Sequence, residues 1–219
     1  MNIVALADIH GRTGNLVRAS KIMAGADLIL LAGDITHFGD AGEARTVIEK
    51  IRAFGKPILA VAGNCDLEDV AEFLAQEGIG LHGRVTSIGG VCFAGLGGSL
   101  PCPGATPSEF QEDDFRRLLE KMKPDMDPRK PLVMLTHQPP RDTVADRIFS
   151  GSHVGSLRFL EFLEERLPLV WFCGHIHESR GLGTVETTQI VNPGPFPEGS
   201  CAWCRIEGNK ITELEIRNF

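Results

Sequence analysis

The sequence predicts an α/β protein in which two packed sheets carry helices on their outer faces. Five short apolar runs have the length of buried strands, and each stops abruptly at a glycine or a polar residue. In the first third of the chain these runs alternate with helical patterns, which favours parallel strand–helix–strand units. Hairpin signals replace this alternation later, which favours a second, mixed sheet. The five runs are 1–7, 28–32, 58–62, 132–136 and 169–173.

The first half of the chain is predicted to alternate strands and helices. Apolar residues at helical spacing follow each of the first two strands. Pro57 begins the third strand, where its missing N–H costs no ladder hydrogen bond. Asp66, with Asp69 three residues later, resembles a capping box, so we expect Asp66 to cap a short helix. The helices predicted here are 16–23, which residues 13–15 lead into, 41–53 and 66–76.

The second half is predicted to combine hairpins, helices and two long loops. Gly89–Gly90 predicts a two-residue hairpin turn, and Gly208–Asn209 predicts another near the C-terminus. Two loops are long enough to shape a binding pocket, and the first of them is rich in glycine and proline. The predicted elements are loops 96–108 and 139–152, hairpin strands 84–88 and 91–95, helices 108–122 and 153–166, a strand near 184–191 and a turn at 192–195.

Composition indicates a single globular domain, residues 1–219. Hydrophobic residues make up 42% and charged residues 23%, as in ordinary globular proteins. The net charge of -7 argues against a polyanionic partner such as duplex DNA, so we expect no nucleic acid. No apolar run approaches the roughly 20 residues that span a bilayer, and no basic segment precedes the first strand. We therefore expect a cytoplasmic protein without a membrane partner.

Six cysteines are present, and reduced thiols are expected in the cytoplasm. Cys201 and Cys204 have the spacing of a redox or zinc pair. They lie in an alternating strand pattern, however, and no second pair completes a zinc site. We expect both cysteines to be structural.

Metal-ligand residue types follow all five apolar runs. In α/β folds, ligands bind beyond the carboxyl ends of the strands, so these side chains are expected to converge. One metal ion does not need seven ligands, whereas two ions that share one bridging carboxylate would use all seven. Oxygen-rich donors with some imidazole favour Mn²⁺, with Fe, Zn²⁺, Ni²⁺ or Co²⁺ as alternatives. Two such ions can activate a bridging hydroxide and clamp a phosphoryl group. The candidate metal ligands are Asp8, His10, Asp34, Asn64, His137, His175 and His177.

These motifs resemble the calcineurin-like metallophosphoesterase family in order and spacing, over nearly the whole chain. The matching motifs are Asp8–x–His10, Gly33–Asp34, Gly63–Asn64, His137 and Gly174–His175–x–His177, followed by a turn at 192–194 similar to the closing loop of the family. The resemblance implies a four-layer αββα sandwich of two mixed sheets. It also implies that Asp34 bridges two ions, and that one ion binds Asp8, His10 and His177 and the other binds Asn64, His137 and His175.

The chain departs from the family at Cys65. The family usually has Gly-Asn-His-Asp or Gly-Asn-His-Glu, whereas this chain has Gly63-Asn64-Cys65-Asp66. The missing histidine would lie near the leaving-group oxygen, and a thiol is a poor substitute for an imidazolium. The variant resembles a branch of small prokaryotic members that favour phosphodiesters. We therefore predict a phosphodiesterase that acts on a small-molecule phosphate ester and uses Asp34, Asn64, Cys65 and His137 in catalysis.

Two other functions stay open at this stage. A phosphomonoesterase, including a protein phosphatase, would use the same ligands, and a non-catalytic interaction scaffold could keep the fold. The sequence leaves the natural substrate and the oligomeric state undetermined. His37 and Arg12 could contact substrate or simply lie on the surface, and His153 could line the pocket or begin a helix.

Overall fold

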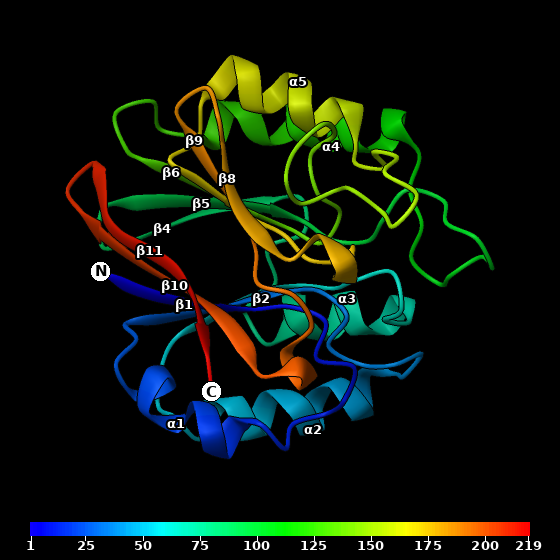
Figure 1. The fold of residues 1–219 in the computed structure, drawn as a ribbon, viewed down its shortest axis with the longest axis vertical. Helices are drawn as coiled ribbons and strands as arrows, with labels where there is room; N and C mark the ends of the chain where they lie inside the picture. Colours follow the sequence, from blue (N-terminus) through cyan, green and yellow to red (C-terminus); the bar gives the residue numbers. More distant parts are fainter.

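The protein is a four-layer sandwich, with two sheets in the middle and helices on both outer faces (Figure 1). The computed structural model describes residues 1–219. The elements in chain order are β1 (Asn2–Leu6), α1 (Leu16–Ala24), β2 (Leu28–Ala32), α2 (Ala41–Arg52), β3 (Ile58–Val61), α3 (Glu68–Gln76), β4 (Arg84–Ile88), β5 (Val91–Leu96), α4 (Glu112–Met122), η1 (Lys123–Asp125), β6 (Leu132–Thr136), α5 (Leu157–Arg166), β7 (Val170–Phe172), η2 (His177–Ser179), β8 (Gly181–Val185), β9 (Thr188–Asn192), η3 (Phe196–Glu198), β10 (Ser200–Glu207) and β11 (Lys210–Asn218).

Both sheets are mixed, as predicted. The first has the order β11-β10-β1-β2-β3, in which β1, β2 and β3 are parallel and β10 runs antiparallel to β1. The second has the order β4-β5-β6-β7-β9-β8, in which β5, β6, β7 and β9 are parallel and the hairpin partners β4 and β8 lie at the edges. The parallel strands, including β3 at the edge of the first sheet, are covered on both faces, which explains their nearly continuous apolar sequences.

Three apolar layers hold the sandwich together. Residues such as Leu30, Phe93 and Phe172 are fully buried between the two sheets. A second layer packs α1, α2 and α3 against the first sheet, and a third packs α4 and α5 against the second. Trp171 anchors this third layer, since its ring contacts Phe159 and its indole N–H donates to Thr136 Oγ1 at 2.8 Å. None of the helices combines the length and the apolar character needed to cross a bilayer.

Three predicted helices begin later in the chain than expected. The helix α4 begins at Glu112 rather than at Ser108, because the backbone N–H of Ser108 is already bonded to Asn64 O and that of Phe110 to Ser99 O. The helix α5 begins at Leu157 rather than at His153, with Ser156 as its N-cap. The third, α3, is described below. The strand expected near 184–191 is instead a two-strand hairpin, β8 and β9, that turns at Glu186.

Cys201 and Cys204 do not face one another. Cys201 packs in the layer between the first sheet and its helices, whereas Cys204 packs between the two sheets. A separation of three residues on a strand places side chains on opposite faces, so the two thiols cannot pair. Burial raises the pKa of both thiols to about 12. The expectation that these cysteines are structural is consistent with this packing.

Asp66 fastens two loops at one end of the first sheet. Its carboxylate is fully buried and accepts the backbone N–H and the hydroxyl of Thr36, both at 2.7 Å. It also accepts the backbone N–H of Ile35 at 3.1 Å and that of Gly63 at 2.7 Å. The prediction that Asp66 caps α3 is therefore wrong: the helix begins at Glu68, after Leu67. A carboxylate that already satisfies four buried donors has no capacity left for a helix end.

We expect Asp66→Asn to lower the free energy of unfolding by about 2–4 kcal/mol, because one oxygen that accepts two buried donors becomes an amide NH₂ that also donates. Urea unfolding of the EDTA-treated protein, followed by circular dichroism, measures the change. Asp69→Asn is the matched control, since Asp69 accepts only the Ala41 N–H, at the surface, and should change stability by less than about 1 kcal/mol. Equal effects of the two substitutions would contradict the role given to Asp66.

Candidate metal centre

The candidate ligands come together where the two sheets meet, at the carboxyl ends of their parallel strands. Asp8, Asp34 and Asn64 follow β1, β2 and β3 of the first sheet, and His137 and His175 follow β6 and β7 of the second. Parallel strands that end at the same edge deliver the residues after them to one place. The sheet topology therefore assembles side chains that lie far apart in the sequence.

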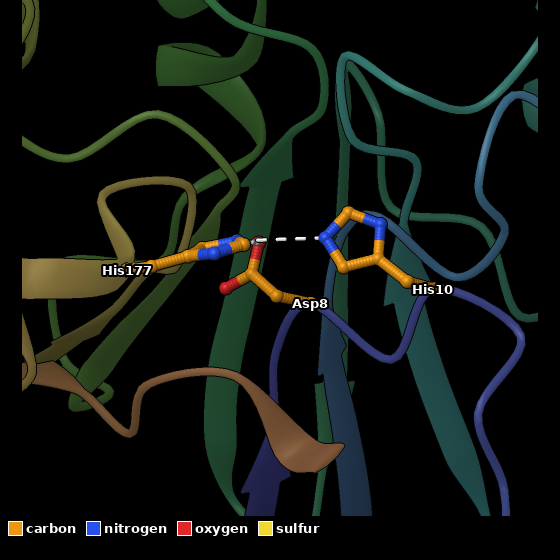
Figure 2. A group of neighbouring side chains, drawn as sticks. All are labelled: Asp8, His10 and His177. Atoms are coloured by element: carbon orange, nitrogen blue, oxygen red, sulfur yellow. Dashed lines mark hydrogen bonds and ion pairs between the residues drawn. The ribbon is translucent and has the colours of Figure 1, made fainter. Parts of the chain in front are cut away.

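Asp8 lies between two imidazoles, as Figure 2 shows. His177 Nε2 is 3.4 Å from Asp8 Oδ1 and 3.4 Å from His10 Nε2. The Asp8 carboxylate is fully buried and also accepts the backbone N–H of His175 at 3.2 Å. Three ligand atoms, one oxygen and two nitrogens, thus surround one point.

Asp34 faces both groups of histidines. Its Oδ2 is 3.7 Å from His10 Nε2, and its Oδ1 is 3.4 Å from His137 Nε2. The Oδ1 atom also accepts the backbone N–H of Cys65 at 2.9 Å, which fixes the carboxylate orientation. The two oxygens of one carboxylate therefore point to imidazoles that belong to different predicted ligand sets, the arrangement that a bridging ligand requires.

His137 and His10 have ring orientations that direct a nitrogen into the site. His137 Nδ1 is 2.8 Å from the carbonyl oxygen of Ala32, and His10 Nδ1 is 3.3 Å from that of Thr36. A carbonyl only accepts, so each Nδ1 donates to the backbone and each Nε2 is directed into the site. His137 Nε2 lies 2.8 Å from Asn64 Oδ1, so an imidazole nitrogen and an amide oxygen face the same point.

His175 is the least constrained of the seven. Its ring centroid is 5.0 Å from that of His137, and its ring nitrogens make no hydrogen bond. Burial, and next the positive charge that His137 can carry, lower the pKa of His175 to about 4. The ring is therefore neutral at pH 7, which is the protonation state of a metal ligand.

Four of the seven candidates have a left-handed backbone, which L residues other than glycine rarely adopt. The φ angles are 52° at Asp8, 49° at His10, 48° at Asp34 and 70° at His175. Each costs about 1–2 kcal/mol relative to the usual conformations. Such strain persists only where the surroundings fix it, and here it turns the side chains away from the strand direction toward a common point. Nothing in the sequence predicted this feature.

Three glycines leave room for the ligands. A Cβ atom on Gly33 would lie 2.4 Å from His137 Nδ1, one on Gly63 would lie 2.0 Å from Asp34 Oδ1, and one on Gly174 would lie 2.7 Å from Asp8 Oδ2. Each glycine directly precedes one candidate ligand in the chain and lies against another. Any larger residue would push a ligand away from the centre.

Asp8 and Asp34 have no lysine or arginine partner within 4.0 Å, although both carboxylates are buried. Burial opposes the ionisation of Asp8, but the hydrogen bond from His177 and the nearby charge of His137 keep the pKa of Asp8 below its ordinary value. The same bond to Asp8 raises the pKa of His177. Buried charges in proteins are paired or coordinate metals. Carboxylates, an amide oxygen and imidazoles form a donor set that fits Mn²⁺, Fe or Zn²⁺.

Cys65 belongs to the same site. Its thiol lies with His10 and Asp34 in one group of potential ligand atoms. Burial, and next the negative charge of Asp34, raise the pKa of the Cys65 thiol well above its ordinary value. The thiol therefore stays protonated at neutral pH, and it can neither attack phosphorus as a thiolate nor donate a proton readily.

Cys102 also reaches the site, which the sequence did not indicate. Asn64 Nδ2 lies 3.7 Å from Cys65 Sγ and 3.9 Å from Cys102 Sγ, so the amide nitrogen faces two thiols while its oxygen faces His137. Cys102 lies in the loop 97–111 between β5 and α4, which was expected to shape the pocket. Glycine and proline content identified the loop but not the residue that it would bring inward.

The remaining candidates lie around this centre. His37 packs its ring 5.3 Å from that of His10, and Arg12 lines a cavity of about 220 Å³ together with His10, His177 and Glu198. His153 makes different contacts: its Nδ1 lies 2.6 Å from Asp146 Oδ1, within the loop between β6 and α5. It does not begin α5, contrary to one of the two roles considered for it.

Comparison with known proteins agrees with this architecture. The chain is 35% identical over 201 residues to the uncharacterized protein MJ1162 of Methanocaldococcus jannaschii, covering 89% of this chain and 88% of that protein. Its fold is similar to that of TT1561 of Thermus thermophilus, with a TM-score of 0.77, 18% identity and coverage of 99% and 98%. It is also similar to that of a dimetal phosphatase from Danio rerio, with a TM-score of 0.68, 13% identity and coverage of 100% and 99%.

The sequence model described as calcineurin-like phosphoesterase matches residues 1–179, from the first strand through both histidines that follow β7. The matched part contains all seven candidate ligands. The chain therefore belongs to the calcineurin-like phosphoesterase family.

Proposed function

We propose that the protein is a binuclear metal-dependent phosphodiesterase that acts on a small-molecule phosphate ester. Membership of the family supports a metal-binding hydrolase. The observation that carries the proposal is the pair of buried carboxylates, Asp8 and Asp34, whose only ionisable partners are imidazoles. Such a pair calls for cations, and divalent ions are the cations that imidazole and carboxylate bind together.

The proposed ligand sets follow the contacts. Asp8, His10 and His177 would hold one ion, and Asn64, His137 and His175 would hold the other. Asp34 would be shared between them, which its two differently directed oxygens support. The amide and carboxylate oxygens favour Mn²⁺.

The protein groups around this centre would orient the ester rather than react with it. Two divalent ions held by these residues would activate a water as nucleophile and would offset the charge of the phosphoryl oxygens. The backbone amides and carbonyls that fix Asp34, His10 and His137 keep the ligands in position before substrate arrives. The protonated Cys65 is unsuited to covalent catalysis, so no protein nucleophile is proposed.

The proposed preference for diesters rests on Cys65, which occupies the position where the family usually has histidine. A monoester leaves more negative charge on the departing oxygen to be neutralised, and a thiol with a raised pKa is a weak proton donor there. Arg12 and His37, near His10, are the other polar groups that could meet the substrate. The measurements below distinguish this proposal from two rival functions, a phosphomonoesterase and a non-catalytic scaffold.

Loss of the shared carboxylate should remove metal and activity together. We expect two divalent ions per chain in the wild type, by elemental mass spectrometry after Mn²⁺ loading and desalting, and at most one in Asp34→Asn. Hydrolysis of bis-p-nitrophenyl phosphate should fall by about 10³-fold or more, which corresponds to ~4 kcal/mol of lost transition-state stabilisation. Asp142→Asn, an exposed loop carboxylate, is the control. Two bound ions in a wild-type protein that hydrolyses no phosphate ester would instead support the scaffold.

The close approach of glycine to a ligand gives a second prediction. We expect Gly63→Ala to raise the dissociation constant for Mn²⁺ at least about tenfold and to destabilise the fold by about 1–3 kcal/mol, because the new methyl group collides with Asp34. Calorimetric titration and urea unfolding measure the two effects. Gly14→Ala adds the same methyl group where nothing lies within 4 Å, and it should leave both quantities nearly unchanged. Unaltered metal affinity in Gly63→Ala would contradict the placement of Asp34.

Cys65 gives the test of substrate preference. With Mn²⁺ bound, kcat/KM should be higher for bis-p-nitrophenyl phosphate than for p-nitrophenyl phosphate, and faster monoester cleavage by the wild type would rule out the diester proposal. Cys65→His should raise monoester cleavage at least about tenfold, with a larger gain for phenyl phosphate, whose leaving group needs protonation more. Cys65→Ser is the matched control, since a hydroxyl is no better as a proton donor than the thiol.

A further inference from the structure

A second cavity, of about 450 Å³, lies at the opposite end of the second sheet from the candidate metal centre. It is bounded by residues 126–132, which lead into β6, by residues 165–169, which lead into β7, and by Asn209 in the turn between β10 and β11. That turn lies at the same end of the molecule as the N-terminus (Figure 1). The metal ligands follow the other ends of β6 and β7, so the five residues of β6, roughly 15 Å of strand, separate the two sites.

The two carboxylates at this cavity already have cationic partners. Asp127 binds Arg129 through two contacts of 2.9 Å, and the hydrogen bonds from the side chain and backbone of Arg129 lower the pKa of Asp127 to about 2. Glu165 binds Lys123 at 2.5 Å. Both carboxylates are therefore already paired, and Asp127 also lies close enough to Lys130 for that positive charge to help lower the pKa of Asp127.

Two cations that line the cavity have no such partner. Arg166, in the last turn of α5, is half-buried and makes no ion pair or side-chain hydrogen bond. Lys130 Nζ contacts only a neutral group, Ser87 Oγ, at 3.1 Å. Burial raises the pKa of Cys92, which also lines the cavity. A backbone hydrogen bond from Asp127 and the charges of Lys130 and Arg166 act to lower it, and the charge of Asp127 acts to raise it. Both positive charges therefore act on the same part of the cavity wall, at Cys92.

Apolar side chains form much of the remaining wall, beside the polar groups of Arg129 and Asn209. Met126 and Leu132 are buried, and Leu169 lies beside them. Leu167 stands on the rim with a left-handed backbone, φ 46°, and leaves nearly half of its side chain exposed. A concave surface that combines apolar side chains with a few convergent polar or charged groups is typical of small-molecule sites.

We propose that this cavity binds a small organic anion, whose carboxylate, phosphate or sulfonate group is held by Lys130 and Arg166 and whose apolar body packs against Met126, Leu132 and Leu169. Arginine and lysine bind such groups through charge-assisted hydrogen bonds. The site is separate from the metal centre, so the proposal does not depend on the proposed catalytic function.

The test uses 8-anilinonaphthalene-1-sulfonate, an aromatic sulfonate that has both required parts and fluoresces when bound in an apolar site. Titration into the full chain loaded with Zn²⁺ should give saturable binding of one probe per chain. Lys130→Gln and Arg166→Gln should each raise the dissociation constant about tenfold or more, because each removes one charge-assisted contact. Arg18→Gln, which removes the same charge from the exposed face of α1, should change it less than twofold.

The position of the probe is checked independently by ¹H–¹⁵N amide shifts. These should change at Leu132, Leu167, Leu169 and Asn209, and stay constant at the loops that carry His10 and His177. The proposal is overturned if the wild type shows no saturable binding, if all four proteins bind equally, or if the shifts appear at the metal ligands instead.

Discussion

The structure depends on the burial of two carboxylates, Asp8 and Asp34, at the junction of two sheets without a fixed cationic side chain to neutralise them. Desolvated negative charges of this kind are costly unless they are paired. The surrounding imidazoles supply only conditional positive charge, and burial keeps His175 neutral at pH 7. The fold therefore maintains a strongly cation-attracting point, and the apolar layer between the sheets gives that point its rigidity.

Close packing of the backbone makes this arrangement possible. A candidate ligand side chain occupies the space that a Cβ atom would fill at each of three glycines, Gly33, Gly63 and Gly174. Left-handed backbone at Asp8 and Asp34 turns the side chains inward at an energetic cost that the apolar layers offset. The site is thus a property of strand ends and their corners, and the helices contribute to it by covering the outer faces of the sheets.

Cys65 and Asp66, the two residues after Asn64, make different contacts although they belong to one sequence motif. Asp66 is committed to four buried donors and ties the loops after β2 and β3 together, so it belongs to the framework. Cys65 faces the centre, and its raised pKa keeps the thiol protonated at neutral pH. At the far ends of the strands, Lys130 and Arg166 line a cavity that also contains apolar side chains, so the proposed anion site lies at the opposite end of the second sheet from the candidate metal centre.

The sequence by itself determined the two mixed sheets and the convergence of the seven ligands, because apolar runs of strand length and the polar residues after them are local features. It did not determine where three helices begin. The polar groups at 66, 108–110 and 153–155 are used by contacts with other loop segments, which local sequence does not specify. The turn of the hairpin at Glu186 contains no glycine, so the sequence carried no clear turn signal there. Only the tertiary structure brought Cys102 to Asn64 and gave Asp66 its partners, because hydrogen bonds between segments depend on how the loops pack, which no local pattern encodes.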